Sequence, residues 1–190
     1  MEKVLYIIAG CNGAGKTTAS FTILPEIINC KEFVNADEIA KGLSPFQPES
    51  VAIESGRIML FRINELIEKG ESFAFETTLS TKSYRQKVIV AQQAGFRVSL
   101  LFFWLNSIDL AIDRVRIRVS EGGHNIENHV IKRRYLRGIK NLFEIYLPIV
   151  DEGLIFDNSF GTPEMVFQKN KEADSIILNP IKYDEIRKFK

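Results

Sequence analysis

A glycine-rich stretch near the start of the chain, G-C-N-G-A-G-K-T-T over residues 10–18, constrains the fold more than any other feature. It fits the pattern G-x-x-x-x-G-K-[ST], with Gly10, Gly15, Lys16 and Thr17 at the fixed positions. An apolar run rich in β-formers precedes it and a segment of helical length follows it. A strand, a tight turn and a helix are the context that a phosphate-binding loop needs, so an ordinary glycine loop is the less favoured alternative.

Such a loop binds a nucleoside triphosphate through its backbone. Glycines allow a turn so tight that N–H groups converge on phosphate oxygens, and the start of the helix adds its positive dipole end. Lys16 would reach the β- and γ-phosphates, and the hydroxyl group of Thr17 would hold Mg²⁺. We therefore expect ATP and Mg²⁺ as cofactors, with nucleotide contacts from Gly10, Asn12, Gly13, Ala14, Gly15, Lys16, Thr17, Thr18 and, further along the chain, Arg114.

A guanine nucleotide is less favoured. A guanine-binding protein would need an N-K-x-D-like motif after a late strand, and the sequence D-N-S at residues 157–159 is not one.

Composition limits the remaining classes. With 190 residues, of which 45% are hydrophobic and 26% charged, the chain suits one globular domain, 1–190. A net charge of +1 predicts binding neither to nucleic acid nor to an acidic membrane. The longest apolar run, residues 98–105, has the length of a buried strand, and no signal peptide is visible. Cys11 and Cys30 are too few for a disulfide framework, so we expect free thiols and a cytoplasmic protein.

Strand-like and helix-like segments alternate along the chain, which predicts a parallel sheet covered on both faces. The fold class is therefore α/β: a P-loop NTPase with a central, mainly parallel five-stranded sheet, helices on both faces and a short β-like C-terminal extension. The apolar strand at 97–105 should be central. We expect strands at 3–9, 32–35, 72–75, 97–105 and 154–156, helices at 16–28, 49–69, 82–94, 107–119 and 126–146, and β-like runs at 165–168 and 175–178.

Three acidic residues close predicted strands: Asp37, Glu76 and Asp157. Because parallel strands share one carboxyl edge, all three should lie near Lys16. Asp37 is the best candidate for the base that deprotonates an acceptor hydroxyl group, although it could also be the N-cap of a helix starting at Glu38. Glu76 has an alternative role beside the Mg²⁺ ion, and Asp157 is expected to hold a turn.

Two arginine-bearing segments flank the glycine pair at 122–123. Arg114 and Arg118 are four residues apart and share a helix face, whereas Arg116 points elsewhere. A basic stretch follows at 132–134. We expect a lid, at about residues 114–135, that closes over a triphosphate, with a solvated basic face as the alternative.

Neither histidine is expected to bind a metal ion. His124 has no partner at ligand spacing, since His129 is five residues on and isolated. A role in stabilising the loop is favoured for His124.

Several of these motifs together resemble the zeta-toxin family of P-loop kinases, from about residue 3 to residue 159. The phosphate loop alone is common, but its combination with N-A-D-E, F-E-T-T-L-S and G-G-H is specific. The resemblance rests on residues 9–18, 34–40, 73–80, 118–119, 122–124, 133–135 and 157–159.

The resemblance implies a kinase that moves the γ-phosphate of ATP onto a sugar hydroxyl group. In characterised zeta toxins the acceptor is UDP-N-acetylglucosamine, and a protein antitoxin is the implied partner. The family pattern assigns the acceptor-binding segment to Glu76 and Thr77, and it does not distinguish Arg133 from Arg134. Carried over by position, the catalytic residues are Asp37 as general base, Lys16, and the charge-neutralising arginines Arg118 and Arg134.

Two other functions stay open. One is a kinase for another metabolite, as in the gluconate, shikimate or nucleoside kinases. The other is a nucleotide-dependent switch or partner-binding module that hydrolyses ATP slowly. A switch needs no acceptor base, so Asp37 argues against it.

Overall fold

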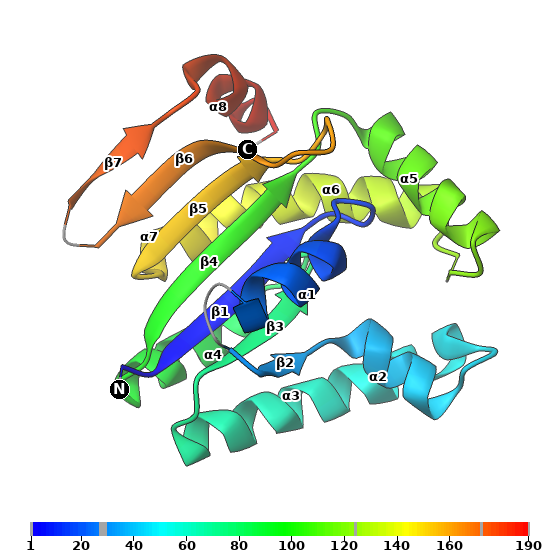
Figure 1. Cartoon of the computed structure of the whole chain (residues 1–190), viewed down its shortest axis with the longest axis horizontal. Coiled ribbons are helices and arrows are strands. Elements are labelled where there is room, and N and C mark those ends of the chain that lie inside the picture. The colour runs from blue at the N-terminus through cyan, green and yellow to red at the C-terminus, as the bar shows by residue number, and fades with distance from the viewer. Residues whose placement is uncertain (1, 27–29, 124, 172, 190) are drawn as a thin grey trace.

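A computed structural model of the chain describes residues 2–26, 30–123, 125–171 and 173–189 (Figure 1). One seven-stranded sheet forms its centre, in the order β2-β3-β1-β4-β5-β6-β7. The first five strands in this order run parallel to one another, β6 runs antiparallel to β5, and β7 runs antiparallel to β6. The strands are β1 (Val4–Gly10), β2 (Glu32–Val34), β3 (Phe73–Thr77), β4 (Arg97–Trp104), β5 (Glu152–Asp157), β6 (Glu164–Asn170) and β7 (Ala173–Ile177).

The α/β class and the parallel five-stranded core are confirmed, but the strand count needs a correction. The two β-like runs near the C-terminus are not a separate extension, because β6 pairs directly with β5 and continues the sheet. Antiparallel strands can be joined by a short turn, whereas a parallel continuation would need a crossover helix. The turn between β5 and β6 is too short for such a helix, so the direction of the sheet reverses there.

Helices cover both faces of the sheet. Figure 1 shows α1 in front of the strands and α4 and α6 behind them. Within the part of the chain that is described, no helix has the length and apolarity needed to cross a membrane. The helical elements are α1 (Lys16–Glu26), α2 (Ala36–Leu43), the 3₁₀ turn η1 (Pro48–Val51), α3 (Ala52–Lys69), α4 (Tyr84–Gln93), α5 (Ile108–Ser120), α6 (Asn128–Asn141), the π-helical turn η2 (Leu142–Tyr146), α7 (Leu147–Ile149) and α8 (Pro180–Arg187).

The largest differences from the predicted helix boundaries occur at three places, and the predicted end of the first helix at residue 28 lies outside the described residues. The helix predicted from Glu49 begins as a 3₁₀ turn, because Pro48 supplies no N–H group and suits a first-turn position. The helix predicted over 126–146 begins at Asn128 and gives way to a π-helical turn at Leu142. The helix after β2 begins at Ala36 rather than Glu38, which changes the interpretation of Asp37 given below.

Strand β4 is the middle of the core, as its composition predicts. Every residue from Val98 to Trp104 is buried, because helices cover both faces and the sequence has no polar alternation. β4 lies between β1 and β5 and pairs with both in parallel. Cys11 and Cys30 are free and buried, in agreement with the expected thiols.

The end of β1 lies so close to β4 that residue 10 must be glycine. Gly10 has φ +146°, and a Cβ atom there would lie 2.3 Å from the carbonyl oxygen of Phe103. Gly42 in α2 has no neighbouring atom within 4 Å of its Cβ position. The phosphate loop therefore starts at a close contact between the backbones of β1 and β4, which leaves no room for a side chain at residue 10.

We expect Gly10→Ala to lower the free energy of unfolding by about 2 kcal/mol or more, since both φ and the contact with Phe103 are unfavourable for a side chain. Gly42→Ala is the matched control and should be stabilising by roughly 0.5 kcal/mol, because alanine favours helix. Urea unfolding of both variants measures the difference. Equal stability of the two variants would contradict the close approach.

Candidate active site

The phosphate loop connects β1 to α1 at the carboxyl edge of the sheet. Gly13 and Gly15 have φ values of +80° and +78°, which side chains disfavour. The N–H group of Ala14 donates to the carbonyl of Cys11 at 3.2 Å, and α1 begins at Lys16 directly after the turn. The loop therefore has the tight backbone and adjoining helix start that the motif predicts.

A carboxylate from β3 lies against the functional side chains of this loop. Thr17 Oγ1 donates to Glu76 Oε2 at 2.8 Å, and Lys16 Nζ lies 3.5 Å from Glu76 Oε1. The Glu76 side chain is only 9% exposed, and Asn35 Nδ2 also donates to it at 3.0 Å. Lys16 Nζ in addition donates to the carbonyl of Cys11 at 2.9 Å.

Thr17 and Glu76 together could hold a Mg²⁺ ion. Hydroxyl and carboxylate oxygens are the ligands that Mg²⁺ prefers, and Thr17 and Glu76 present both within hydrogen-bond distance of each other. The contact between Thr17 and Glu76 favours a role of Glu76 beside Mg²⁺ over direct contact with the acceptor. Both roles stay predictions.

Thr77, the second residue of the predicted acceptor segment, is occupied in a turn. It is buried, and its Oγ1 accepts a hydrogen bond from the N–H group of Leu79 at 3.1 Å. Leu79 has a positive φ of 53°, and its carbonyl accepts from Asn141 Nδ2 at 2.7 Å. Thr77 therefore stabilises a strained turn, and its contact with an acceptor stays a prediction.

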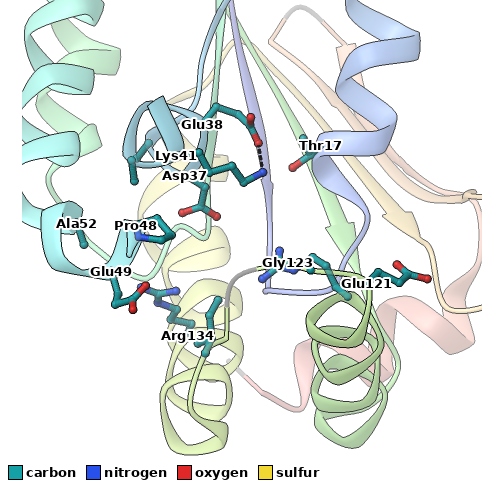
Figure 2. Close-up of a pocket in the computed structure, with 15 residues that line it drawn as sticks. Thr17, Asp37, Glu38, Lys41, Pro48, Glu49, Ala52, Glu121, Gly123 and Arg134 are labelled. Atoms are coloured by element: carbon teal, nitrogen blue, oxygen red, sulfur yellow. Dashed lines mark hydrogen bonds and ion pairs between the residues drawn. The ribbon is translucent and has the colours of Figure 1, made fainter. Parts of the chain in front are cut away.

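Asp37 is not the N-cap of α2, so that alternative is wrong. Asn35 is the cap: its side-chain oxygen accepts from the N–H group of Asp37 at 2.8 Å. The Asp37 side chain is left exposed in the first turn of the helix, where the dipole favours a carboxylate. Figure 2 shows it pointing into the space that Thr17 also faces. The cap could have been recognised in the N-A-D-E motif, because asparagine ranks with aspartate as a cap residue.

A cavity of about 520 Å³ brings several predicted residues together. Thr17 and Asp37 line it on one side, and Gly123 and Arg134 line it on the other (Figure 2). Arg118 also lines this cavity. The remaining lining residues are Ala36, Glu38, Ala40, Lys41, Pro48, Glu49, Ala52, Glu121, Gly122 and Ile126.

The structure distinguishes Arg134 from Arg133. Arg134 lines the cavity, and its Nη1 donates to Asn12 Oδ1 of the phosphate loop at 3.2 Å, whereas Arg133 is exposed. Burial lowers the pKa of Arg134, nearby Asp37 opposes that change, and Arg133 adds to it. The guanidinium group stays charged, since its ordinary pKa is far above neutral pH.

Arg114 contacts the phosphate loop but does not line the cavity. Its Nη2 donates to the carbonyl of Ser159 at 3.0 Å, and its Nη1 lies 3.5 Å from the carbonyl of Gly13. Arg116 instead pairs with Asp113 on the exposed face of α5. The prediction that Arg116 points away from the face shared by Arg114 and Arg118 is confirmed. Direct contact of Arg114 with a nucleotide, and the contact predicted for exposed Thr18, remain predictions.

The predicted lid corresponds to the end of α5, the connection after it and the start of α6. The N–H group of Gly123 donates to the carbonyl of Arg118 at 2.8 Å, which fixes the chain at the cavity wall. His124 lies outside the described residues. His129 is exposed, 2.9 Å from Glu127, and the described residues contain no cluster of three potential metal ligands from His, Cys, Asp and Glu. Closure of the segment stays a prediction.

The sheet order, the phosphate loop and the adjacent cavity define the fold of a P-loop kinase. The sequence model of the zeta toxin family matches residues 1–158. The chain therefore belongs to the zeta toxin family.

Comparisons with other proteins agree at the level of fold. An uncharacterized protein of Haemophilus influenzae is 29% identical over 135 residues, which are 71% of this chain and 94% of that protein. The crystal structure of AvrRxo1-ORF1:AvrRxo1-ORF2 with sulphate ions matches with a TM-score of 0.80 at 18% identity, covering 97% of this chain and 63% of that one. A structure of the PezAT toxin–antitoxin system of Streptococcus pneumoniae matches at 0.66 and 14% identity, covering 99% and 84%. This chain thus spans under two thirds of the AvrRxo1 chain.

Proposed function

We propose that the protein is an ATP-dependent kinase that phosphorylates a hydroxyl group of a small molecule. One observation carries the proposal: Thr17, Asp37 and Arg134 line the same cavity. A phosphate-binding group, a free carboxylate and a partly buried cation therefore face one space, as phosphoryl transfer to an acceptor requires. The structures of AvrRxo1-ORF1:-ORF2 with ATP and of a gluconokinase have related folds and support ATP as the donor.

The residues of the chain divide the reaction between them. Lys16 and the loop N–H groups hold the triphosphate, and Thr17 and Glu76 would hold Mg²⁺, which neutralises phosphate charge when bound. The oxygen of the acceptor hydroxyl group bonds to the γ-phosphorus, and Asp37 takes the proton of that hydroxyl group. The bond from that phosphorus to the bridging oxygen breaks, and ADP leaves with the electron pair. Arg118 and Arg134 stabilise the negative charge on the phosphoryl group as it is transferred.

The cleft on the Asp37 side favours an acceptor larger than a single sugar ring. A second cavity of about 670 Å³ continues from the first and shares Lys41, Pro48 and Arg134 with it. Pro45, Phe46 and Val130 line the second cavity but not the first, and Phe46 is 97% exposed. An exposed aromatic ring at a cavity mouth offers a stacking surface.

A nucleotide sugar such as UDP-N-acetylglucosamine is the acceptor that we propose within this class. Its base would lie on Phe46, and its diphosphate would be near the basic residues Lys41, Arg118 and Arg134 that line the first cavity. Glu38 pairs with Lys41 at 2.7 Å, so this part of the lining is not uniformly basic.

A protein partner is part of the proposal. The PezAT structure is of a toxin–antitoxin system, and its fold covers nearly all of this chain. We propose that an antitoxin encoded in a neighbouring reading frame neutralises this protein. Growth of cells that express the chain with and without that frame is the direct comparison.

Transfer of labelled γ-phosphate from ATP to a panel of acceptors tests the activity. The panel contains UDP-N-acetylglucosamine, free N-acetylglucosamine, gluconate and shikimate, and Lys16→Ala is the inactive control, expected to lose about a hundredfold or more. Labelling of gluconate or shikimate alone would favour another metabolite kinase. Slow ATP hydrolysis without transfer to any acceptor would favour a switch.

Asp37→Asn should reduce transfer by roughly a hundredfold to ten-thousandfold, because an amide cannot accept the proton. Stability should change by less than about 1 kcal/mol, since Asn35 rather than Asp37 caps the helix. ATP affinity should be nearly unchanged. The control is Asp113→Asn, an exposed carboxylate on α5. Full transfer by a folded Asp37→Asn protein would exclude Asp37 as the base.

Arg134→Ala should lower kcat by about a hundredfold with a smaller change in the KM for ATP, since its charge acts mainly in the transition state. Arg133→Ala is the matched control and should be near wild type, because that side chain is exposed. Arg118→Ala should resemble Arg134→Ala. Steady-state kinetics of the three variants measure this, and equal kinetics for the Arg133 and Arg134 variants would reject the assignment.

A further inference from the structure

A buried carboxylate at the end of β5 organises the turn after it. The Asp157 side chain is 1% exposed, and its Oδ1 accepts from both the N–H group, at 2.9 Å, and the hydroxyl group of Ser159. Its Oδ2 lies 2.5 Å from Lys182 Nζ. Burial raises the pKa of Asp157, but the charge of Lys182 and the hydrogen bonds from Ser159 outweigh it, so the pKa lies below its usual range.

The same turn holds two parts of the nucleotide site. Asn158 Nδ2 donates to the carbonyl of Ala14, inside the phosphate loop, at 2.8 Å. The carbonyl of Ser159 accepts from Arg114 Nη2 at 3.0 Å. A shift of the turn would therefore move the phosphate loop and the arginine beside it together.

Lys182 is placed by the C-terminal helix rather than by the turn. Asn179 caps α8 by accepting from the N–H group of Lys182 at 3.1 Å, and Asn179 Nδ2 donates to Glu164 Oε1 at 2.7 Å. Glu164 Oε2 also lies 2.7 Å from Lys182 Nζ. The cap and the lysine are thus both tied to the start of β6, beside which Figure 1 shows α8.

Packing of aromatic and apolar side chains keeps α8 in place. Ile186 is fully buried, and Tyr183 stacks on Phe167 of β6 with ring centroids 5.0 Å apart. Phe189, just after the helix, packs edge-to-face on Tyr135 of α6, the residue after Arg134. This helix lies beyond residues 1–158, which match the family model.

We propose that Lys182 is a positioning residue for the nucleoside triphosphate. Its ammonium group balances the buried Asp157 carboxylate, and this balance keeps the turn at residues 157–159 in the conformation that supports the phosphate loop and Arg114. Asp157 is buried and Lys182 is 21% exposed, so removing the lysine leaves a buried carboxylate without its charge partner, which is unfavourable. The turn would then rearrange, and the nucleotide site with it. The inference rests on nucleotide binding in the proposed function and is independent of the acceptor.

Binding of Mg-ATP, measured by titration calorimetry, tests the role. Lys182→Met should weaken binding by about tenfold or more and raise the KM for ATP more than it lowers kcat. Lys182→Arg should restore binding. Lys171→Met is the matched control: Lys171 makes the same kind of pair, 2.9 Å from Asp151, at the other end of β6, where it is 71% exposed. It should bind Mg-ATP like the wild type.

A double variant keeps the test decisive if Lys182→Met does not fold. Asp157→Asn combined with Lys182→Met removes both charges and keeps an oxygen for the N–H group of Ser159. It should fold and bind Mg-ATP within about threefold of the wild type. Three results would each overturn the proposal: wild-type binding by Lys182→Met, equal weakening by Lys171→Met, or a folded double variant that binds about tenfold more weakly. Failure of the wild type to bind Mg-ATP would instead reject the proposed function.

Discussion

The pairing of β1 between β3 and β4 is the constraint on which the site depends. Parallel neighbours bring their carboxyl ends to one edge, so Ala9 pairs with Thr77 and Gly10 with Phe103. The phosphate loop starts at that point, and Glu76 of β3 is carried directly to Lys16 and Thr17. Substitution at Gly10 would therefore disturb the chemistry as well as the core, because the same backbone contact sets both.

The carboxyl edge of the sheet also depends on the pairing of its acidic residues with basic ones. Buried or partly buried charges are unfavourable unless they are paired and hydrogen-bonded. Glu76 is near Lys16, Asp157 is paired with Lys182, and the charge of Asp37 acts on Arg134. The carboxylates of the first two pairs are largely buried beside a lysine, whereas Asp37 keeps an exposed carboxylate. That difference is why we propose Asp37, and not Glu76 or Asp157, as the residue that accepts the proton.

The acceptor side is built differently from the phosphate side. Its walls come from α2, η1 and the segment between α5 and α6, and they contain more apolar surface, including Pro48, Ile126 and Phe46. Membership of the zeta toxin family and the fold of a P-loop kinase leave the acceptor undetermined.

Local patterns in the sequence determined the phosphate loop, the five parallel strands, the central place of β4 and the shared edge for Asp37, Glu76 and Asp157, because each follows from neighbouring residues or from a rule of parallel sheets. Three features depended on tertiary structure. Asn35 and Asp37 are both good caps, and only the extended backbone at Asn35 decides between them. Arg133 and Arg134 are adjacent on α6, and only packing decides which one faces the cavity. Lys182 and Asp157 are far apart in sequence, and their contact exists only because β6 turns back on β5 and α8 packs beside it, an outcome of long-range packing that no local pattern encodes.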